Sequence, residues 1–242
     1  MIRIDATHNG PSGSGHGGVT AGKAAELVDP WRAVVRLHVP IPLETPLIPV
    51  GRPGGTVELR SRGVRVATAR PLDRPLDVDR FEPLPAELVA WAEQAWLGGA
   101  AGVNYGPTCF GCGPDRRPGD GLGLRPGPVA GYGVHATRWV PASSGEVPPW
   151  LVWAALDCAG AGPAMAACGP GEAAVTGELA VEIHQPIDGL LSWRLVSRQR
   201  RRSGRKVLTE SALVDPDGRP VAVSVATWFK VPAASAAPGS AA

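Results

Sequence analysis

Apolar and polar residues follow two different periods in the first hundred residues. A glycine-rich loop leads into small apolar residues with helical spacing over residues 16–28, and Asp29-Pro30 would end that helix. From Trp31 the period changes to two, which predicts antiparallel strands separated by Gly and Pro turns over residues 33–39, 55–60 and 64–69. The first part of the chain is therefore expected to form one helix followed by a strand meander.

A proline-rich stretch at residues 71–85 interrupts this pattern, and residues 86–98 then carry apolar side chains at helical spacing. We interpret these two stretches as a connector with one helix. Beyond it the pattern predicts a strand, a mostly buried helix that begins at a proline, and then further strands. The strand is expected at residues 134–140, the helix at residues 149–157, and the further strands at residues 177–185, 190–199, 206–214 and 220–231.

The second half thus repeats the order of the first. The sequence predicts an α+β protein of two units, each with a helix packed against a curved antiparallel sheet. The units are expected at residues 1–105, which include the connector, and at residues 106–232. Residues 233–242 are mostly Ala, Ser and Gly and are predicted to be a disordered tail.

Composition narrows the range of partners. The 242 residues carry a net charge of +2 from side chains of mixed sign, which favours a small-molecule ligand over nucleic acid or a membrane surface. Neither a signal-peptide core nor an apolar run of about 18 residues is visible, so the cytoplasm is the expected location.

The cysteines are possible metal ligands. Four cysteines are too few for a disulfide scaffold, and reduced thiols are expected. Cys109 and Cys112 have the C-x-x-C spacing of a zinc-binding pair, but Cys158 and Cys168 do not form a second pair at ligand spacing. The sequence therefore predicts a loop motif, with no metal and no cofactor.

Three short motifs carry a family resemblance: His16-Gly17-Gly18 at a helix start, the CFGCG run from Cys109 followed by GLGL at residues 121–124, and WAALD ending at Asp157. With these motifs the chain resembles the hotdog-fold acyl-CoA thioesterase superfamily, in its double-hotdog arrangement. The resemblance implies two antiparallel sheets, each wrapped around a central helix, and a ligand tunnel between the helices. It also implies that an acid, or a water that it orients, attacks the thioester carbonyl, and that a homodimer forms.

The glycines at the first helix are candidates for holding the substrate oxygen. A helix N-terminus offers unpaired N–H groups and a partial positive charge, and Gly17 and Gly18 have no side chains to block a substrate. The alternative is that these glycines only allow the helix to pack closely against its sheet.

Asp157 is the candidate general base because an acid in an apolar helical run is costly unless it has a partner or a role. It matches the family's catalytic acid, although an acid at the solvent edge or one bonded to nearby backbone is the alternative. Thr176, just before the predicted strand at residues 177–185, matches a hydroxyl that positions water in some double-hotdog thioesterases. Otherwise it is an ordinary threonine at the start of a strand.

Several other residues are candidates for the site. His16 is either a general acid or a helix cap. Asn9 and Trp153 are predicted to contact the substrate. Arg201 and Arg202 belong to a basic run at a predicted hairpin, which either binds the phosphates of coenzyme A or is a solvated turn.

Two departures from the family pattern limit the functional prediction. The first helix lacks an acid at the expected place, so one active pocket per chain is expected. Residues 225–228 read VATW, where many acyl-CoA thioesterases of this arrangement carry a glutamine. From the resemblance we still predict an enzyme that hydrolyses the thioester of an acyl-CoA or an acyl-carrier protein. A hydratase, dehydratase or cyclase, or a non-catalytic acyl-binding protein, is the alternative.

Overall fold

The structure, a computed structural model, describes residues 1–96, 106–141 and 144–233. Nearly all of the predicted tail, and the end of the predicted helix over residues 86–98, lie outside these ranges. The helices are η1 (Ala6–His8), α1 (Gly17–Ala25), η2 (Pro53–Gly55), α2 (Ala86–Gln94) and α3 (Pro149–Ala166). The strands are β1 (Arg32–Leu37), β2 (Ile48–Gly51), β3 (Val57–Ser61), β4 (Val64–Pro71), β5 (Gly127–Val129), β6 (Val134–Trp139), β7 (Glu172–Ile183), β8 (Trp193–Ser203), β9 (Lys206–Val214) and β10 (Pro220–Pro232).

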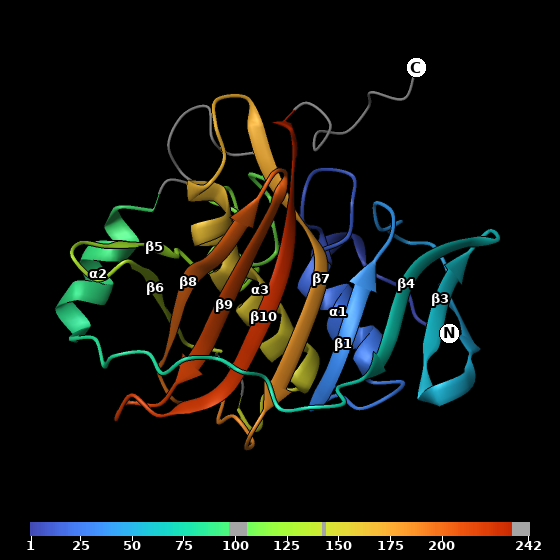
Figure 1. The fold of residues 1–242 in the computed structure, drawn as a ribbon, viewed down its shortest axis with the longest axis horizontal. Helices are drawn as coiled ribbons and strands as arrows, with labels where there is room; N and C mark the ends of the chain where they lie inside the picture. The colour runs from blue at the N-terminus through green and yellow to red at the C-terminus, as the bar shows by residue number, and fades with distance from the viewer. Residues whose placement is uncertain (97–105, 142–143, 234–242) are drawn as a thin grey trace.

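The described strands form one antiparallel sheet in the order β2-β3-β4-β1-β7-β10-β9-β8-β6-β5 (Figure 1). The α+β class is as predicted, but there is one ten-stranded sheet where two were expected. The two halves are joined because β1 pairs with β7, with Val34 opposite Ala180. Backbone hydrogen bonds therefore run without interruption from one half to the other.

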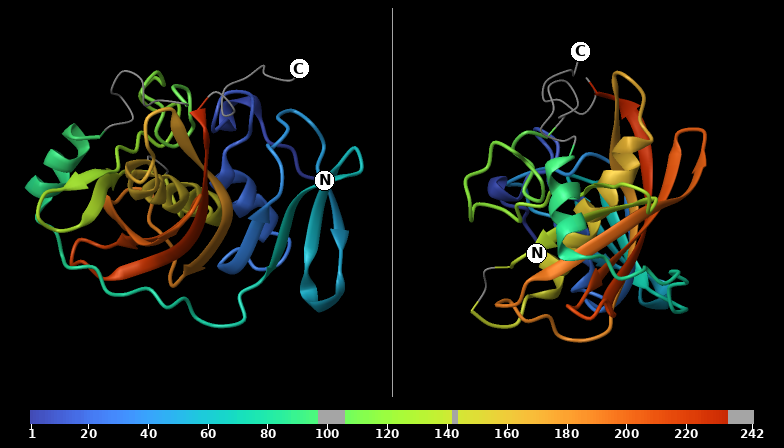
Figure 2. Two further views of the ribbon diagram at one scale, coloured as in Figure 1. Left: turned by 45° about the horizontal axis from the view of Figure 1, so that its top comes forward. Right: turned by 90° about the vertical axis from the view of Figure 1, so that its left-hand side faces the viewer.

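Helices α1 and α3 lie side by side on one face of the curved sheet (Figures 1 and 2). α1 contacts β1 and β4, while α3 contacts the strands of the second half. α3 is apolar all round and buried along most of its length, as expected for a helix at the centre of a core. No helix within the described ranges has the length and apolar character needed to cross a lipid bilayer.

The connector and α2 cover part of the opposite face of the sheet, on the strands of the second half. Three apolar side chains of the connector and α2 pack against Val196 of β8 and Ala212 of β9: Phe81, Leu84 and Val89. The next residues along these strands, Leu195 and Leu213, belong to the core on the helix side. This alternation is the period of two that predicted the strands. α2 contacts β5 and β6, so the connector that was assigned to the first unit packs against the second.

α3 runs nine residues beyond the predicted end at Asp157, through Gly160, Gly162 and Pro163. These residues disfavour a helix, and Pro163 has no N–H to donate to the carbonyl of Ala159. The hydroxyl of Ser197 on β8 donates to that carbonyl instead, at 2.7 Å. This part of α3 and the Ser197 hydroxyl are both buried. Contacts with the rest of the fold therefore overcome the low helix propensity of these residues.

Replacing Ser197 by Ala should therefore leave a buried carbonyl without a donor. We expect the free energy of unfolding to fall by about 1 to 3 kcal/mol, measured by urea denaturation. Ser224→Ala is the matched control, because the buried Ser224 hydroxyl on β10 has no partner among the described residues. That variant should be neutral or slightly stabilising. Equal losses in the two variants would contradict the role of Ser197.

His135 on β6 is a second polar group enclosed by the fold. Its ring lies against α3, where a methyl group built on Gly162 would be 3.1 Å from Cδ2. The Nδ1 atom is buried and has no partner among the described residues. Burial lowers the pKa of His135 to about 4.

Because the unfolded chain takes up this proton near its ordinary pKa of about 6.5, His135 should destabilise the fold as the pH falls from about 6.5 to about 4. The free energy of unfolding should therefore fall between pH 7 and pH 4, and replacing His135 by Leu should make this fall smaller by up to about 3 kcal/mol. The measurement is the difference in unfolding free energy between the two pH values. The exposed His184, replaced by Gln, is the control and should leave the pH profile unchanged. An identical profile in wild type and the His135→Leu variant would refute the assignment.

Candidate active site

His16 caps the N-terminus of α1. It has an extended backbone, and its Nδ1 accepts from the N–H of Val19 at 3.3 Å. The side chain is almost fully buried, and the His16 carbonyl accepts from the hydroxyl of Thr20. Of the two roles considered for His16, the cap is therefore the one that this geometry displays.

Gly18 brings α1 against α3. A methyl group built on Gly18 would lie 2.6 Å from Cβ of Asp157 and 2.7 Å from Cα of Ala154, so only glycine fits there. At this approach the Gly18 N–H donates to Oδ2 of Asp157 at 2.7 Å. Close packing and a bond to the carboxylate are thus achieved by the same residue.

Asp157 is 3% exposed, and its side chain bonds to partners from other elements, α1 and β7. The hydroxyl of Thr176 donates to Oδ1 at 2.8 Å, and Nδ1 of His16 lies 3.7 Å from Oδ2. Thr176 lies inside β7, not before a strand as the sequence predicted. The structure thus brings together the three residues that were expected to be catalytic.

Burial and polar contacts act on Asp157 in opposite directions. Burial raises the pKa of the carboxyl group, while His16, the Thr176 hydroxyl and the Gly18 amide lower it. Burial has the larger effect, so the net shift is upward. A carboxylate with a raised pKa is a stronger base than one in water.

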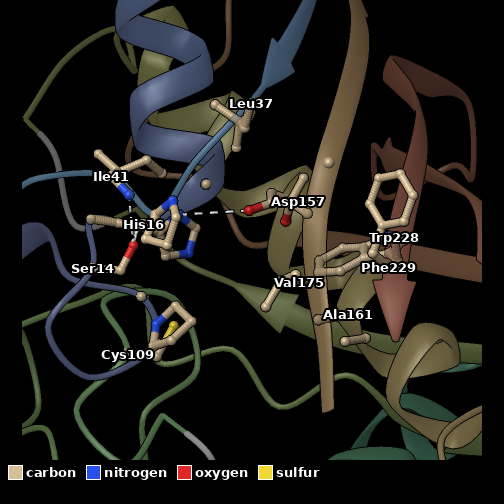
Figure 3. Close-up of a pocket in the computed structure, with 18 of the residues that line it drawn as sticks. Ser14, His16, Leu37, Ile41, Cys109, Asp157, Ala161, Val175, Trp228 and Phe229 are labelled. Carbon is tan, nitrogen blue, oxygen red and sulfur yellow. Dashed lines mark hydrogen bonds and ion pairs between the residues drawn. The ribbon is translucent and has the colours of Figure 1, made fainter. Parts of the chain in front are cut away.

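These residues form part of the wall of a cavity of about 900 Å³. Figure 3 shows His16 and Asp157 facing each other, with Val175 and Phe229 on the other side of Asp157. The cavity is bounded by the loop before α1, the end of β1, the middle of α3 and the ends of β7 and β10. Its lining is mostly apolar, including Leu37 and Ile41, and its size suits a small organic ligand.

The two amides expected to bind the substrate oxygen differ in the structure. The Gly18 amide is occupied by Asp157. No hydrogen bond from the Gly17 amide is found within the described ranges, and Gly17 lines the cavity. A methyl group at Gly17 would lie 3.0 Å from Oγ1 of Thr176, so glycine keeps this space open.

The other predicted contact residues do not line this cavity. Asn9 joins two loops, because its Nδ2 donates to Thr108 Oγ1 at 3.0 Å and its Oδ1 accepts from Arg116 at 2.6 Å. Trp153 is buried, and its indole N–H donates to the carbonyl of Pro30. Arg201 and Arg202 are exposed near the β8–β9 turn.

The structure adds cavity residues that the sequence prediction did not include. Cys109 and Cys158 lie beside His16 at the cavity wall, and Cys112 also lines the cavity. The neighbouring Cys112 and Cys158 thiols and the His16 ring hold the pKa of Cys109 well below its usual value. The C-x-x-C spacing was the signal in the sequence, but nothing near it pointed to Cys158 or His16.

The final strand contributes Trp228 to the cavity, in the stretch that lacks the expected glutamine. Its indole N–H donates to Thr209 Oγ1 at 2.9 Å. The ring is therefore fixed and offers an apolar surface to the cavity.

Comparisons with known proteins place this fold. The TesB protein of Mycobacterium avium subspecies paratuberculosis matches with a TM-score of 0.59 and 15% identity, over 95% of this chain and 91% of that one. A candidate thioesterase from Novosphingobium aromaticivorans matches with a TM-score of 0.58 and 13% identity, over 91% and 90%. The acyl-CoA thioesterase II TesB2 of Mycobacterium marinum matches with a TM-score of 0.51 and 13% identity, over 89% of each chain.

No protein-family model matches the chain, and no curated protein matches its sequence. The structural likeness, at these identities, concerns the fold. The chain has the hotdog fold of TesB-type thioesterases, as its short motifs predicted.

Proposed function

We propose that the chain is a thioesterase-like enzyme that hydrolyses an acyl-CoA or acyl-carrier thioester in the cavity beside Asp157. One observation carries the proposal: a buried carboxylate, held by Gly18 and Thr176, lies at the wall of an apolar cavity next to a helix N-terminus. The proposal includes a double-hotdog arrangement in which the two halves share one sheet, and the likeness of the fold to TesB-type thioesterases supports it. The homodimer implied by the resemblance stays a prediction.

Asp157 would act as general base. Each carboxylate oxygen can accept two hydrogen bonds, so both retain an acceptor site for water after bonding Gly18 and Thr176. Asp157 takes a proton from the water, whose oxygen attacks the thioester carbonyl carbon. The C–S bond then breaks, and the departing thiolate takes the proton, which leaves a carboxylic acid and a free thiol.

The Gly17 amide is the proposed donor to the carbonyl oxygen as negative charge develops there. It stands at the first position of α1, where the helix dipole adds a partial positive charge. The apolar lining formed by Leu37, Val175 and Phe229 would hold the acyl group. At the mouth, the exposed Arg36 offers a guanidinium group to coenzyme A phosphates, in place of Arg201 and Arg202.

A non-hydrolytic enzyme of the same cavity, such as a hydratase, dehydratase or cyclase, is the second candidate. It is favoured by Trp228, whose fixed apolar ring stands in the stretch where a polar amide was expected.

Replacing Asp157 by Asn should reduce kcat for acyl-CoA hydrolysis by about 10² to 10⁴-fold with little change in KM, because the base is lost while the side-chain shape is kept. The assay uses acyl-CoAs of varied length and branching. It measures free coenzyme A by chromatography, since the four cysteines of the chain would interfere with a thiol reagent.

Asp217→Asn, in the exposed β9–β10 turn, is the matched control and should retain full activity. Undiminished hydrolysis in the Asp157→Asn variant would rule out Asp157 as the base. A hydrated or rearranged product without release of coenzyme A would support the second candidate, and tight binding without any product would support a binding protein.

Thr176→Val should lower kcat by about 10-fold, because the carboxylate loses the donor that fixes its orientation while the volume of the side chain is kept. Thr56→Val, away from the cavity before β3, should leave kcat unchanged. Steady-state kinetics on the best acyl-CoA provides the comparison, and equal rates for both variants would count against a role for Thr176.

A further inference from the structure

The proposed hydrolysis leaves unexplained a cluster of metal-binding side chains beside the cavity. His16 Nε2 lies 3.0 Å from Cys158 Sγ. The ligand atoms of His16, Cys109 and Cys158 all lie within 4.8 Å of one another. Cys112 lies at the edge of this group. It lines the same cavity and its thiol interacts with those of Cys109 and Cys158, but its Sγ is not within 4.8 Å of all three ligand atoms. All four cysteines of the chain are free, so no disulfide accounts for this arrangement.

The donor set and its spacing suit zinc. Three cysteines and one histidine are a common ligand set of structural zinc sites, and two of them come from a C-x-x-C pair. With Zn–S bonds of about 2.3 Å and Zn–N bonds of about 2.0 Å, tetrahedral ligand atoms lie about 3.5 to 3.8 Å apart. The separations among the ligand atoms of His16, Cys109 and Cys158, which include 3.0 Å and do not exceed 4.8 Å, bracket these values, and the Cys112 thiol would have to move toward the ion to complete the set.

The loop that carries the cysteine pair is shaped to reach this position. A methyl group on Gly111 would lie 2.0 Å from Cys158 Sγ and 3.0 Å from His16 Nε2. The Gly113 amide donates to the carbonyl of Cys109 at 2.8 Å, which closes the turn between the two cysteines. A methyl group on Gly113 would be 2.4 Å from the Cys109 nitrogen. Glycine is thus required at both positions for the cysteines to meet α1 and α3.

We propose that Cys109, Cys112, Cys158 and His16 bind one zinc ion in a closed tetrahedral site. The metal replaces the thiol protons, which pass to solvent. Four protein ligands leave no open position, so the ion has a structural role and does not activate water. It would join the Cys109–Cys112 loop to the start of α1 and the middle of α3.

Metal binding fixes the proton of His16. A ring whose Nε2 binds zinc carries its proton on Nδ1, whereas the present bond from Val19 to Nδ1 requires the proton on Nε2. In the zinc-bound form the Nδ1–H has Asp157 Oδ2 as its acceptor, now 3.7 Å away. A carboxylate that accepts from a metal-bound histidine is the usual outer partner of such sites.

The site also bears on the proposed reaction, and this step alone depends on that proposal. His16 directly precedes Gly17, the proposed donor to the substrate oxygen, and Cys158 directly follows Asp157, the proposed base. A metal bound to both neighbours would hold donor and base at a fixed separation. His16 and Cys158 are then positioning residues for the reaction.

Metal content tests the proposal without reference to activity. The full chain, without a histidine tag, is purified under reducing conditions from zinc-supplemented cells, dialysed, and analysed for transition metals. We expect about one zinc per chain in wild type and in Cys168→Ser, and less than about a tenth of that in Cys112→Ser. Cys168 is the matched control because its thiol donates to the carbonyl of Ala164, outside the cluster.

Two further measurements use the wild-type protein, and a second variant accompanies them. Cobalt(II) added to the zinc-depleted wild-type protein should produce thiolate-to-cobalt charge-transfer absorption and the visible bands of a tetrahedral ion. His16→Asn, which keeps a helix cap, should weaken cobalt binding by at least about tenfold. Removing zinc from wild type with a chelator should also lower its Tm.

The proposal is overturned if wild type contains no stoichiometric zinc and the reduced protein gives no cobalt charge-transfer band. It is equally overturned if Cys168→Ser loses as much metal as Cys112→Ser, or if iron or copper occupies the site. Because none of these readouts involves hydrolysis, failure of the zinc site and failure of the thioesterase proposal are separate results.

Discussion

The structure depends on the hydrogen bond between the Gly18 amide and the carboxylate of Asp157. A carboxylate at 3% exposure costs several kcal/mol unless its oxygens are bonded, and here one oxygen binds α1 while the other binds β7 through Thr176. The bond is possible only because Gly18 has no side chain, so that the two helix backbones can meet. This contact, together with the close approach of Gly22 to Trp150, sets how α1 and α3 cross. It also sets the direction of the carboxylate in the cavity.

Much of the fold and of the site could be predicted because it depends on local sequence patterns. The period of two predicted most of the strands, and the unsupported acid in an apolar run singled out Asp157. The continuation of α3 through Gly160, Gly162 and Pro163 could not be predicted, since it depends on a hydroxyl from β8, far along the chain. The union of the two halves in one sheet was also missed, because periodicity identifies a strand but not its neighbours.

The site residues also divide into those that local sequence identifies and those that only the fold brings together. Asp157 and His16 were predicted from their local context and Thr176 from the family resemblance, and the three meet in the structure. Arg201 and Arg202 were chosen for their charge alone, and the fold leaves them away from the cavity. The cysteine cluster was not predicted because Cys158 and Cys168 do not form a second pair at ligand spacing. Its residues come from three distant segments, and the fold brings them together.

The pairing of β1 with β7 has a consequence for how a ligand reaches the cavity. Proteins that open by hinge motion swing two bodies about a few connecting residues, and such a motion would here break a continuous ladder of backbone hydrogen bonds. The pairing of β1 with β7 therefore disfavours opening by separation of the halves. Under the proposed function, a substrate would enter past residues 10–15 and 36–41, the two segments that hold the exposed residues of the cavity lining. These segments would then decide which molecules reach Asp157.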